Sequence, residues 1–237
     1  MTIAARANAT PLVLLPRTAI PSSGAVDVDL QALNGAATTP LLQGNGGGVT
    51  GNLWVNGVPI PGSISLVQPG GGSATFNSST DYYRFTRSDT GGAAITTIRP
   101  YRFTYDFADA HRDDIHIISI GQNGPAHPRP LYDAQAIIQR MSALDKRFLV
   151  VNKPSSTDAE DAAYHDAFGR RYFPLRKYLV AYGLADAGLS ATAQDNTDIA
   201  AGTVPTSLRI DAVHGNAAYY HIWGQQLFNR LVELGWV

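Results

Sequence analysis

Two short apolar runs separated by a helical pattern constrain the fold of this chain more than any other feature. The first run is IHIISIG at 115–121, and the second is FLVVN at 148–152. Runs that are apolar at almost every position are expected of strands covered on both faces. A helix that joins two such strands predicts a right-handed parallel βαβ unit. Between the runs, apolar residues recur at helical spacing, at Ala134, Ile137, Ile138, Met141 and Leu144.

The part of the chain after residue 152 has a helical pattern. Residues 158–172 and 175–184 predict helices that are interrupted at Pro174. A last helix is expected from about Ala217 to Leu234. These helices and the two apolar runs together predict the α/β class. The buried stripe of the last helix is expected to contain Tyr220, Trp223, Leu227, Leu231 and Leu234.

The region from about 20 to 107 has a different texture, rich in Gly, Thr, Ser and Asn. Runs such as NLWVNGV at 52–58 and YYRFTR at 82–87 alternate in polarity, and turns such as Asn56-Gly57 separate the strands. This pattern predicts antiparallel strands and hairpins. Because PLVLLP at 11–16 predicts a buried strand of the α/β part, the β-rich region is interpreted as an insertion into that part.

The length of 237 residues allows one large core, or one core with a smaller appended module. We therefore expect a discontinuous α/β core formed by residues 1–18 and 109–237. A β-rich module with antiparallel strands is expected at residues 19–108.

The composition excludes several classes of function. Lys and Arg number 18 against 19 Asp and Glu, so a formal net charge of −1 draws the chain neither to nucleic acid nor to anionic lipid. Cysteine is absent, which excludes a disulfide framework, a thiolate zinc site and a cysteine nucleophile. The longest early apolar stretch, Leu12 to Leu15, is too short for a signal peptide or a transmembrane segment. We expect no nucleic-acid partner and no membrane partner.

The segment LRIDAVHGN at 208–216 contains an acidic residue three places before a histidine, directly before the last predicted helix. A carboxylate hydrogen-bonded to one imidazole nitrogen holds the tautomer in which the other nitrogen can act as a base. Asp211 and His214 are therefore candidate catalytic residues, the first orienting the second. The alternative is that the Asp–His pair or Asn216 caps the following helix, and the two roles are compatible.

The segment GQNGPAHP at 121–128 follows the first predicted strand, at the end where ligands bind in open α/β sheets. Gly121 lets the backbone approach a ligand closely, and the side-chain amide of Asn123 is able to donate a hydrogen bond to an oxyanion. Both are candidate oxyanion-hole residues. The alternative is an ordinary turn, since Gly, Asn and Pro all favour turns.

The other polar clusters have simpler interpretations. His111, Arg112, Asp113 and Asp114 include metal-ligating types, but a charged turn before a buried strand explains them. The four cations of GRRYFPLRK at 169–177 fit a solvated helix face. No metal site and no cofactor is expected. Three histidines have no partner at a suitable spacing: His127, His165 and His221.

Gly121 with Asn123, and Asp211 with His214, resemble two of the four motif blocks of the SGNH/GDSL hydrolase family. The similarity is strongest to members encoded in bacteriophage tail genes, and it covers about 115–237. It implies a flavodoxin-like (SGNH hydrolase-like) parallel sheet with helices on both faces, here carrying the inserted β module. It also implies an esterase site in which His214 is the base and Asp211 orients it. Gly121 and Asn123 would hold the oxyanion.

The family's Gly-Asp-Ser nucleophile turn, and the central strand before it, have no match in this chain. Residues 1–16 resemble text that follows the second block, and Ser22 and Ser23 lie in a predicted β-turn rather than a strand-to-helix elbow. Three explanations are open: Met1 is internal to a longer product, the serine comes from another polypeptide, or the domain is a degenerate hydrolase. Because a missing central strand exposes edges and an apolar face, a partner segment is favoured.

The resemblance implies a carboxylic-ester hydrolase, a carbohydrate deacetylase or esterase of a phage virion, whose serine comes from outside this chain. The chain alone is then expected to be inactive and oligomeric. Its expected partners are the missing N-terminal segment or another virion subunit, and a cell-surface glycan. The alternative is a non-catalytic tail or virion protein, structural or glycan-binding, with a degenerate hydrolase fold. Either way, the expected location is the virion or the extracellular space.

Overall fold

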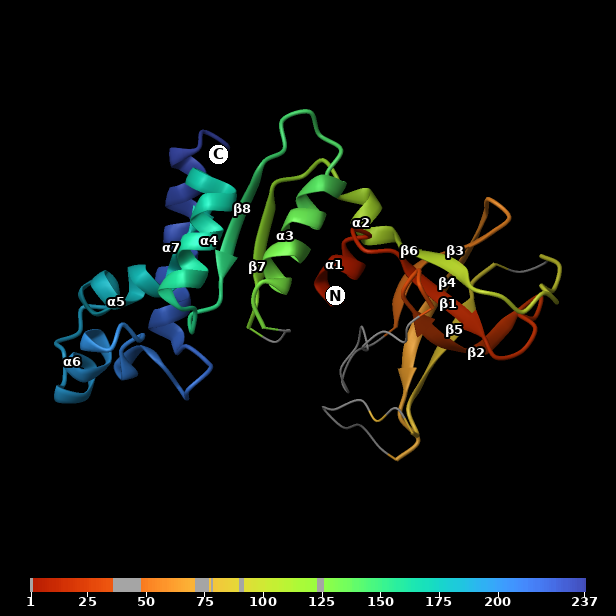
Figure 1. The fold of residues 1–237 in the computed structure, drawn as a ribbon, viewed down its shortest axis with the longest axis horizontal. Helices are drawn as coiled ribbons and strands as arrows, with labels where there is room; N and C mark the ends of the chain where they lie inside the picture. Colours follow the sequence, from red (N-terminus) through yellow and green to blue (C-terminus); the bar gives the residue numbers. More distant parts are fainter. Residues whose placement is uncertain (1, 36–47, 71–76, 78, 90–91, 123–125) are drawn as a thin grey trace. The chain divides into compact units, whose positions relative to one another are not determined.

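The computed structural model divides into two compact units, which are described separately (Figure 1). The barrel unit comprises residues 1–113 and 135–144, and the α/β unit comprises residues 114–134 and 145–237. The structure describes the whole chain except residues 1, 36–47, 71–76, 78, 90–91 and 123–125.

The barrel unit is built around six strands that close into an antiparallel barrel in the order β1-β2-β5-β4-β3-β6. Each strand pairs with two neighbours, so the hydrogen bonds form a complete circle. In chain order, the elements are α1 (Thr2–Arg6), β1 (Leu12–Pro16), β2 (Gly24–Gln31), β3 (Val49–Val55), β4 (Val58–Val67), β5 (Tyr82–Arg87), β6 (Tyr101–Tyr105) and α2 (Asp106–Ala110).

Alternation of polarity explains the barrel strands. In β5, Tyr83 and Phe85 are buried, whereas Tyr82 and Arg84 between them are only partly buried. The β3–β4 hairpin turns at Asn56-Gly57, where both residues have positive φ (50° and 83°), as a type I′ turn requires. The predicted hairpin and antiparallel strands are confirmed.

Two glycines make room for large rings in the barrel core. Gly51 and Gly62 lie opposite each other on β3 and β4. A Cβ atom at Gly62 would lie 2.5 Å from Phe85 Cε2, and one at Gly51 would lie 2.5 Å from Phe103 Cζ. The two rings pack edge to face with centroids 6.2 Å apart. A side chain at either glycine would therefore displace a core ring.

The expected flavodoxin-like parallel sheet with helices on both faces is wrong. The fold is a closed barrel of six antiparallel strands plus a small parallel sheet of three strands. The apolar run at 11–16 was expected to be a strand of the α/β core. It forms β1 of the barrel instead, which pairs antiparallel with β2 and β6. An apolar run fits a barrel strand as well as a buried parallel strand, because periodicity does not identify the partners of a strand.

The α/β unit contains the three-stranded sheet, in the order β7-β8-β9. The strands β7 and β8 pair in parallel and α3 lies between them in sequence, which confirms the predicted parallel strand–helix–strand order. From residue 135 onward, α3 belongs to the barrel unit. The elements are β7 (His116–Ile120), α3 (Arg129–Arg140), β8 (Phe148–Asn152), α4 (Asp158–Phe168), the 3₁₀ helix η1 (Gly169–Arg171), β9 (Tyr172–Phe173), α5 (Leu175–Asp186), α6 (Ala193–Ala200), the 3₁₀ helix η2 (Thr206–Leu208) and α7 (Ala217–Glu233).

The two longer strands of this sheet differ in burial. All residues of β8 are buried, as predicted. In β7, Ile118 and Ile120 are buried, but Ile117 is 46% exposed and Ser119 is also exposed. The prediction that β7 is covered on both faces is therefore wrong. One core cluster of the unit contains Leu149, Val151, Phe173, Leu175, Leu179, Leu184, Val204, Leu208, Tyr219 and Ile222.

The helix predicted over 158–172 is shorter than expected. It ends at Phe168, because Gly169 follows with a positive φ of 53°, a conformation that glycine adopts readily at helix ends. The chain then makes one 3₁₀ turn, and Tyr172–Phe173 forms β9 beside β8.

Two apolar stripes also need correction. Leu144, expected on the crossover helix, is fully exposed beyond the end of α3. The predicted last helix is confirmed as α7, but Tyr220 is 49% exposed, whereas Tyr219 and Ile222 are buried. Spacing alone does not identify which of two adjacent aromatic residues faces the core. The other predicted stripe residues are partly buried against this core: Trp223, Leu227, Leu231 and Leu234.

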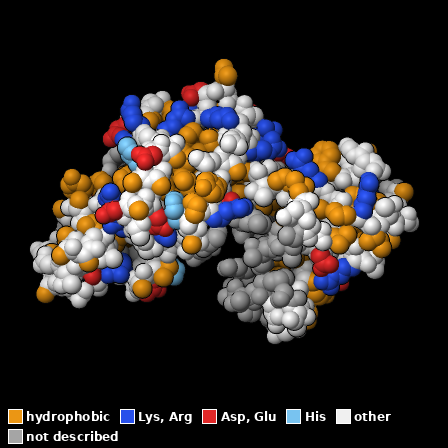
Figure 2. Space-filling model, viewed as in Figure 1, with side chains coloured by type: hydrophobic (Ala, Val, Ile, Leu, Met, Phe, Trp, Pro, Cys, Tyr) orange, Lys and Arg blue, Asp and Glu red, His pale blue; other side chains and the backbone are white. Residues whose placement is uncertain are grey.

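The surface carries charges of both signs. On the face shown in Figure 2, basic and acidic side chains lie among each other and among hydrophobic side chains. This mixture agrees with the formal net charge of −1. Within the part of the chain that the structure describes, no helix is both long and apolar enough to cross a membrane.

Candidate active site

Asp211 and His214 lie in the loop between η2 and α7, and backbone contacts close this loop. The N–H of Ile210 donates to His214 O at 2.9 Å. An antiparallel bridge joins Arg209 to Gly215. The two candidate catalytic residues are thus held within one narrow turn of the chain.

Asn216 fastens the end of this loop to α7. Its Oδ1 accepts a hydrogen bond from the N–H of Tyr219 at 3.1 Å, so Asn216 is the N-cap of the helix. Its Nδ2 donates to Ser207 O at 2.8 Å, and its backbone N–H donates to Leu208 O at 3.0 Å. The predicted capping role of Asn216 is confirmed, and it leaves the Asp–His pair free for another role.

Asp211 and His214 form a direct carboxylate–imidazole pair. His214 Nδ1 lies 2.9 Å from Asp211 Oδ2 and 3.1 Å from Oδ1. Asp211 Oδ1 also accepts from the backbone N–H groups of Val213 and His214, both at 2.7 Å. The hydrogen bond from the His214 side chain, followed by the two backbone donors, lowers the pKa of Asp211 to about 2. The ionised carboxylate holds the imidazole proton on Nδ1, which leaves Nε2 to accept a proton.

A cavity of about 50 Å³ lies beside this pair. Segments after β7, after β8 and after α6 form its walls together with the loop before α7. The side chain of His214 is 65% exposed, so a bound molecule can reach the imidazole. Loops at the carboxyl ends of parallel strands are where ligands bind in α/β sheets. The lining residues are Gln122, Pro154, Ser155, Thr203, Val204, Arg209, Ala212, Val213, His214, Gly215 and Tyr219.

The structure places one of the two predicted oxyanion residues. Asn123 lies outside the described residues. Gly121 has a φ of 102°, in the region that favours glycine, and its neighbour Gln122 lines the cavity beside His214. The turn after β7 and the loop before α7 therefore meet at one cavity. The role of Gly121 at an oxyanion stays a prediction.

A buried amide at the end of β8 was missed by the sequence analysis. Asn152 is 4% exposed, and its Oδ1 accepts from the N–H of Lys153 at 2.8 Å. Its Nδ2 has no hydrogen-bond partner among the described residues. A Cβ atom at Gly121 would lie 3.1 Å from Asn152 Oδ1, so the glycine leaves room for this amide. The available signal was an asparagine at the carboxyl end of a buried strand.

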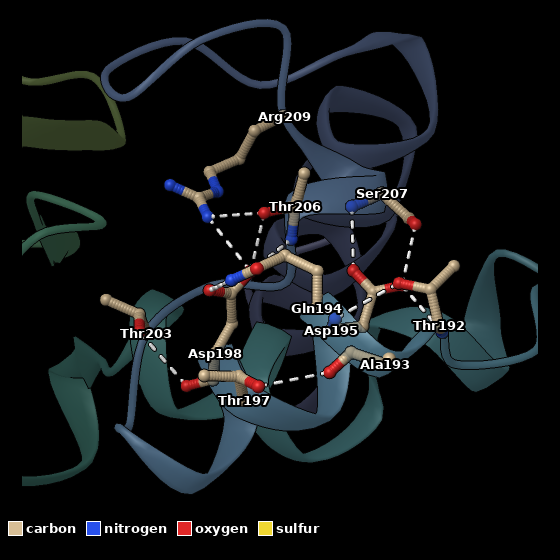
Figure 3. Close-up of polar contacts among 10 residues, drawn as sticks. All are labelled: Thr192, Ala193, Gln194, Asp195, Thr197, Asp198, Thr203, Thr206, Ser207 and Arg209. Atoms are coloured by element: carbon tan, nitrogen blue, oxygen red, sulfur yellow. Dashed lines mark hydrogen bonds and ion pairs between the residues drawn. The ribbon is translucent and has the colours of Figure 1, made fainter.

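Two buried carboxylates of α6 anchor the segment that leads to the Asp–His loop (Figure 3). Asp195 Oδ1 accepts from the N–H of Ser207 at 2.9 Å, and Oδ2 accepts from the hydroxyls of Thr192 and Ser207, both at 2.7 Å. Thr192 and Asp195 also form the capping box of α6. The hydrogen bond from the Ser207 N–H is the largest of the causes that hold the pKa of Asp195 well below its usual range.

Asp198, one turn further along α6, binds the start of the loop itself. Its Oδ2 accepts from the N–H of Thr206 at 2.8 Å, from the Thr206 hydroxyl at 2.6 Å and from Arg209 Nη2 at 3.0 Å. The Thr206 hydroxyl is the main cause of a lowered pKa of Asp198. Because Arg209 both begins the loop and lines the cavity, α6 determines where the loop starts.

Arg176, expected on a solvated helix face, is only 8% exposed, so that prediction is wrong for this residue. Its Nη2 lies 2.8 Å from Asp161 Oδ2, and its Nη1 donates to Gly202 O at 2.7 Å. Asp161 Oδ1 accepts from the hydroxyls of Ser156 and Tyr172, at 2.7 and 2.6 Å. A buried cation requires such partners. This network ties together the segments after β8 and after α6, which both supply cavity walls.

The cluster at 111–114 is a charged turn, as the simpler interpretation proposed. Arg112 Nε donates to Arg140 O at 3.2 Å, and the Ser142 hydroxyl donates to Asp113. Among the residues that the structure describes, no group of three or more His, Asp or Glu side chains could hold a metal ion.

Ser22 and Ser23, which were not favoured as nucleophiles, are exposed residues just before β2 of the barrel unit.

Comparisons of the chain with protein-family models, with curated proteins and with solved structures found no match.

Proposed function

We propose that the α/β unit carries a carboxylic-ester hydrolase site in which His214 is the general base and Asp211 orients it. The observation that carries this proposal is the 2.9 Å contact between Asp211 Oδ2 and His214 Nδ1 at the edge of a cavity. General bases of this kind remove a proton from an attacking hydroxyl and return it to the leaving group. The proposal concerns the chemistry of this unit and does not depend on a flavodoxin-like fold.

The size of the cavity indicates which part of an ester would enter it. A volume of about 50 Å³ is a few times the roughly 10–15 Å³ that a cavity needs to hold one water. We propose that a small acyl group such as acetyl enters this space. The alcohol part of the ester would lie on the open surface. The resemblance to phage hydrolases adds the rest of the proposal, an acetylated cell-surface glycan met by a virion protein.

The test is hydrolysis of p-nitrophenyl acetate and acetylated sugars by the full chain. His214→Ala should lower kcat/KM by about 10²–10⁴-fold, the usual contribution of a positioned base. Asp211→Asn should lower it less, because the imidazole remains. The matched control is His221→Ala, which removes an exposed histidine of α7 that does not line the cavity and should leave kcat/KM unchanged.

The pH dependence adds a second check. The pKa of Asp211, lowered to about 2, keeps this carboxylate ionised throughout the usual assay range. A loss of activity on acidification within that range therefore does not report protonation of Asp211. Equal rates for His214→Ala and His221→Ala, or no hydrolysis of any ester, would remove the enzyme proposal and leave the non-catalytic virion protein.

A further inference from the structure

Ser155 lines the same cavity as His214 and carries a hydroxyl group. It lies in the short segment between β8 and α4, at the carboxyl end of a fully buried strand. The nucleophile was expected from outside this chain, because the chain has no match to the family's Gly-Asp-Ser turn or to the strand before it. Because the observed fold is not the expected flavodoxin-like sheet, the position of that turn no longer limits where a serine could act, and a serine that lines the cavity is the first candidate.

The residues on both sides of Ser155 are firmly held. Ser156 is 5% exposed, and its hydroxyl donates to Asp161 Oδ1 at 2.7 Å. Thr157 caps α4, because its hydroxyl accepts from the N–H of Glu160 at 3.1 Å. Lys153, on the other side, forms an ion pair with Glu160 at 3.1 Å. These contacts restrain the segment that carries Ser155 on both sides.

Of the three successive residues Ser155, Ser156 and Thr157, only Ser155 has a hydroxyl that makes no hydrogen bond to another described residue. Its side chain is exposed and has no hydrogen-bond partner within the described residues. The threonine of the cavity wall, Thr203, differs from it because its hydroxyl donates to Asp198 O at 3.0 Å. Nucleophilic catalysis by a serine requires a hydroxyl that can reach an oriented imidazole, and Ser155 and His214 line the same cavity.

We infer that Ser155 is the nucleophile of the proposed ester hydrolase, with His214 as its base. This inference rests on the proposed function. Ser155 Oγ attacks the carbonyl carbon of the ester while its proton passes to His214 Nε2. The carbon–oxygen bond to the alcohol then breaks, and the alcohol leaves with that proton. Water attacks the acyl-Ser155 ester, again giving a proton to His214, and the carboxylic acid and free serine are restored.

The first test is kinetic and uses the full chain. Ser155→Ala should lower kcat/KM for p-nitrophenyl acetate as much as His214→Ala does, about 10²–10⁴-fold. The double variant should show no further loss, because a nucleophile and its base act as one unit. The matched control is Ser119→Ala, an exposed serine of β7 outside the cavity lining, which should keep full activity. A fluorophosphonate probe should label Ser155 in the wild type.

The second test uses no ester and measures whether the side chain at position 155 lies close enough to His214 to be affected by it. Because the chain contains no cysteine, Ser155→Cys introduces a single thiol. A thiol beside an imidazole has a lowered pKa, so its alkylation by iodoacetamide should begin at lower pH than that of Ser119→Cys. Adding His214→Ala should remove the difference.

The outcomes separate the inference from the proposed function. If Ser155→Ala retains turnover that His214→Ala abolishes, or if the probe labels another residue, the inference is wrong and the hydrolase stands. If no variant and no wild-type chain hydrolyses any ester, both are wrong. If the thiols of Ser155→Cys and Ser119→Cys alkylate with the same pH dependence, Ser155 is not coupled to His214.

Discussion

The barrel unit and the α/β unit differ in what they bury. The barrel encloses an apolar core, and an ion pair such as Arg17–Asp29 lies on its outside with side chains 46% and 47% exposed. In the α/β unit, carboxylates themselves are buried and fully engaged, as in Asp161 and Asp195, which are 2% and 0% exposed. Among the described residues, the buried carboxylates are Asp81 in the barrel unit and Asp133, Asp161, Asp195 and Asp198 in the α/β unit.

The difference follows from the sheets. A closed barrel satisfies its backbone hydrogen bonds by pairing every strand on both sides, so side chains are free to fill the core. A sheet of three strands cannot do this for the long segments between its helices. Buried carboxylates hold these segments instead, because each one accepts several hydrogen bonds from loop N–H groups and hydroxyls. The loops around the cavity are therefore held by several buried carboxylates, whereas the core cluster of the barrel is apolar and buried Arg87 pairs with Asp89, which is 29% exposed.

The substitution with the largest expected effect on stability is Asp161→Ala. It removes the buried partner of Arg176 and leaves the exposed Asp158 as its carboxylate partner, and we expect the α/β unit to lose at most about 3–5 kcal/mol of unfolding free energy. Hydrogen exchange resolved by peptide should show lost protection in α4, β9 and α5 and unchanged protection in the barrel strands. The control Asp29→Ala breaks an exposed pair and should cost less than about 1 kcal/mol. An equal loss for the two variants would contradict the comparison.

Asp195→Asn should cost less, about 1.5–3 kcal/mol, because it weakens hydrogen bonds to a charged acceptor. The effect depends on pH. The pKa of Asp195 in the folded state is lower than its ordinary value of 3.8, so its contribution is complete above that value and is lost as the pH falls below it. Urea unfolding at a series of pH values should show a steeper acid loss in the wild type than in the variant. Parallel pH profiles would show that Asp195 is not an electrostatic anchor.

In the barrel, Gly62→Ala tests apolar packing. The new Cβ atom would lie 2.5 Å from both Phe85 Cε2 and Thr86 O, so the core must shift. We expect a cost of about 1–3 kcal/mol, the usual range for overpacking. Thermal unfolding with peptide-resolved hydrogen exchange should place the loss in β3, β4 and β5. A neutral result would mean that the barrel core is looser than these contacts indicate.

Gly224→Ala should change the unfolding free energy least, and it should raise it rather than lower it. A Cβ atom at this position of α7 has no atom within 4 Å, so it meets open space. Replacing a helical glycine by alanine should stabilise the α/β unit by about 0.5–1 kcal/mol. A rise in the midpoint of urea unfolding measures the gain, and a loss would show that α7 packs differently.

The sequence predicted the features that depend on neighbouring residues. Alternation within β5 and the Asn56-Gly57 turn identified barrel strands, and the spacing of Asp211 and His214 identified the pair. Closure of the barrel depends on pairings such as Leu12 with Phe103, which are far apart in the chain and leave no local signal. The apolar run of β1 was therefore assigned to the wrong sheet.

The candidate site shows the same limit. The segment containing Ser155 resembles an ordinary run of helix-capping hydroxyls, and two of its three hydroxyl residues do have structural roles. Only the fold brings the remaining one to the cavity of His214. Arg176 was misplaced for a related reason, since its carboxylate partner lies on another helix.

The geometry of the Asp–His pair is contained in a single turn of four residues. Two backbone N–H groups of that turn hold the carboxylate, and the carboxylate holds the imidazole. The orientation of the base is therefore encoded in four consecutive residues, which the Arg209–Gly215 bridge closes into one unit. Which reaction such a pair supports is then decided by the hydroxyl or water that the rest of the fold brings to the free Nε2.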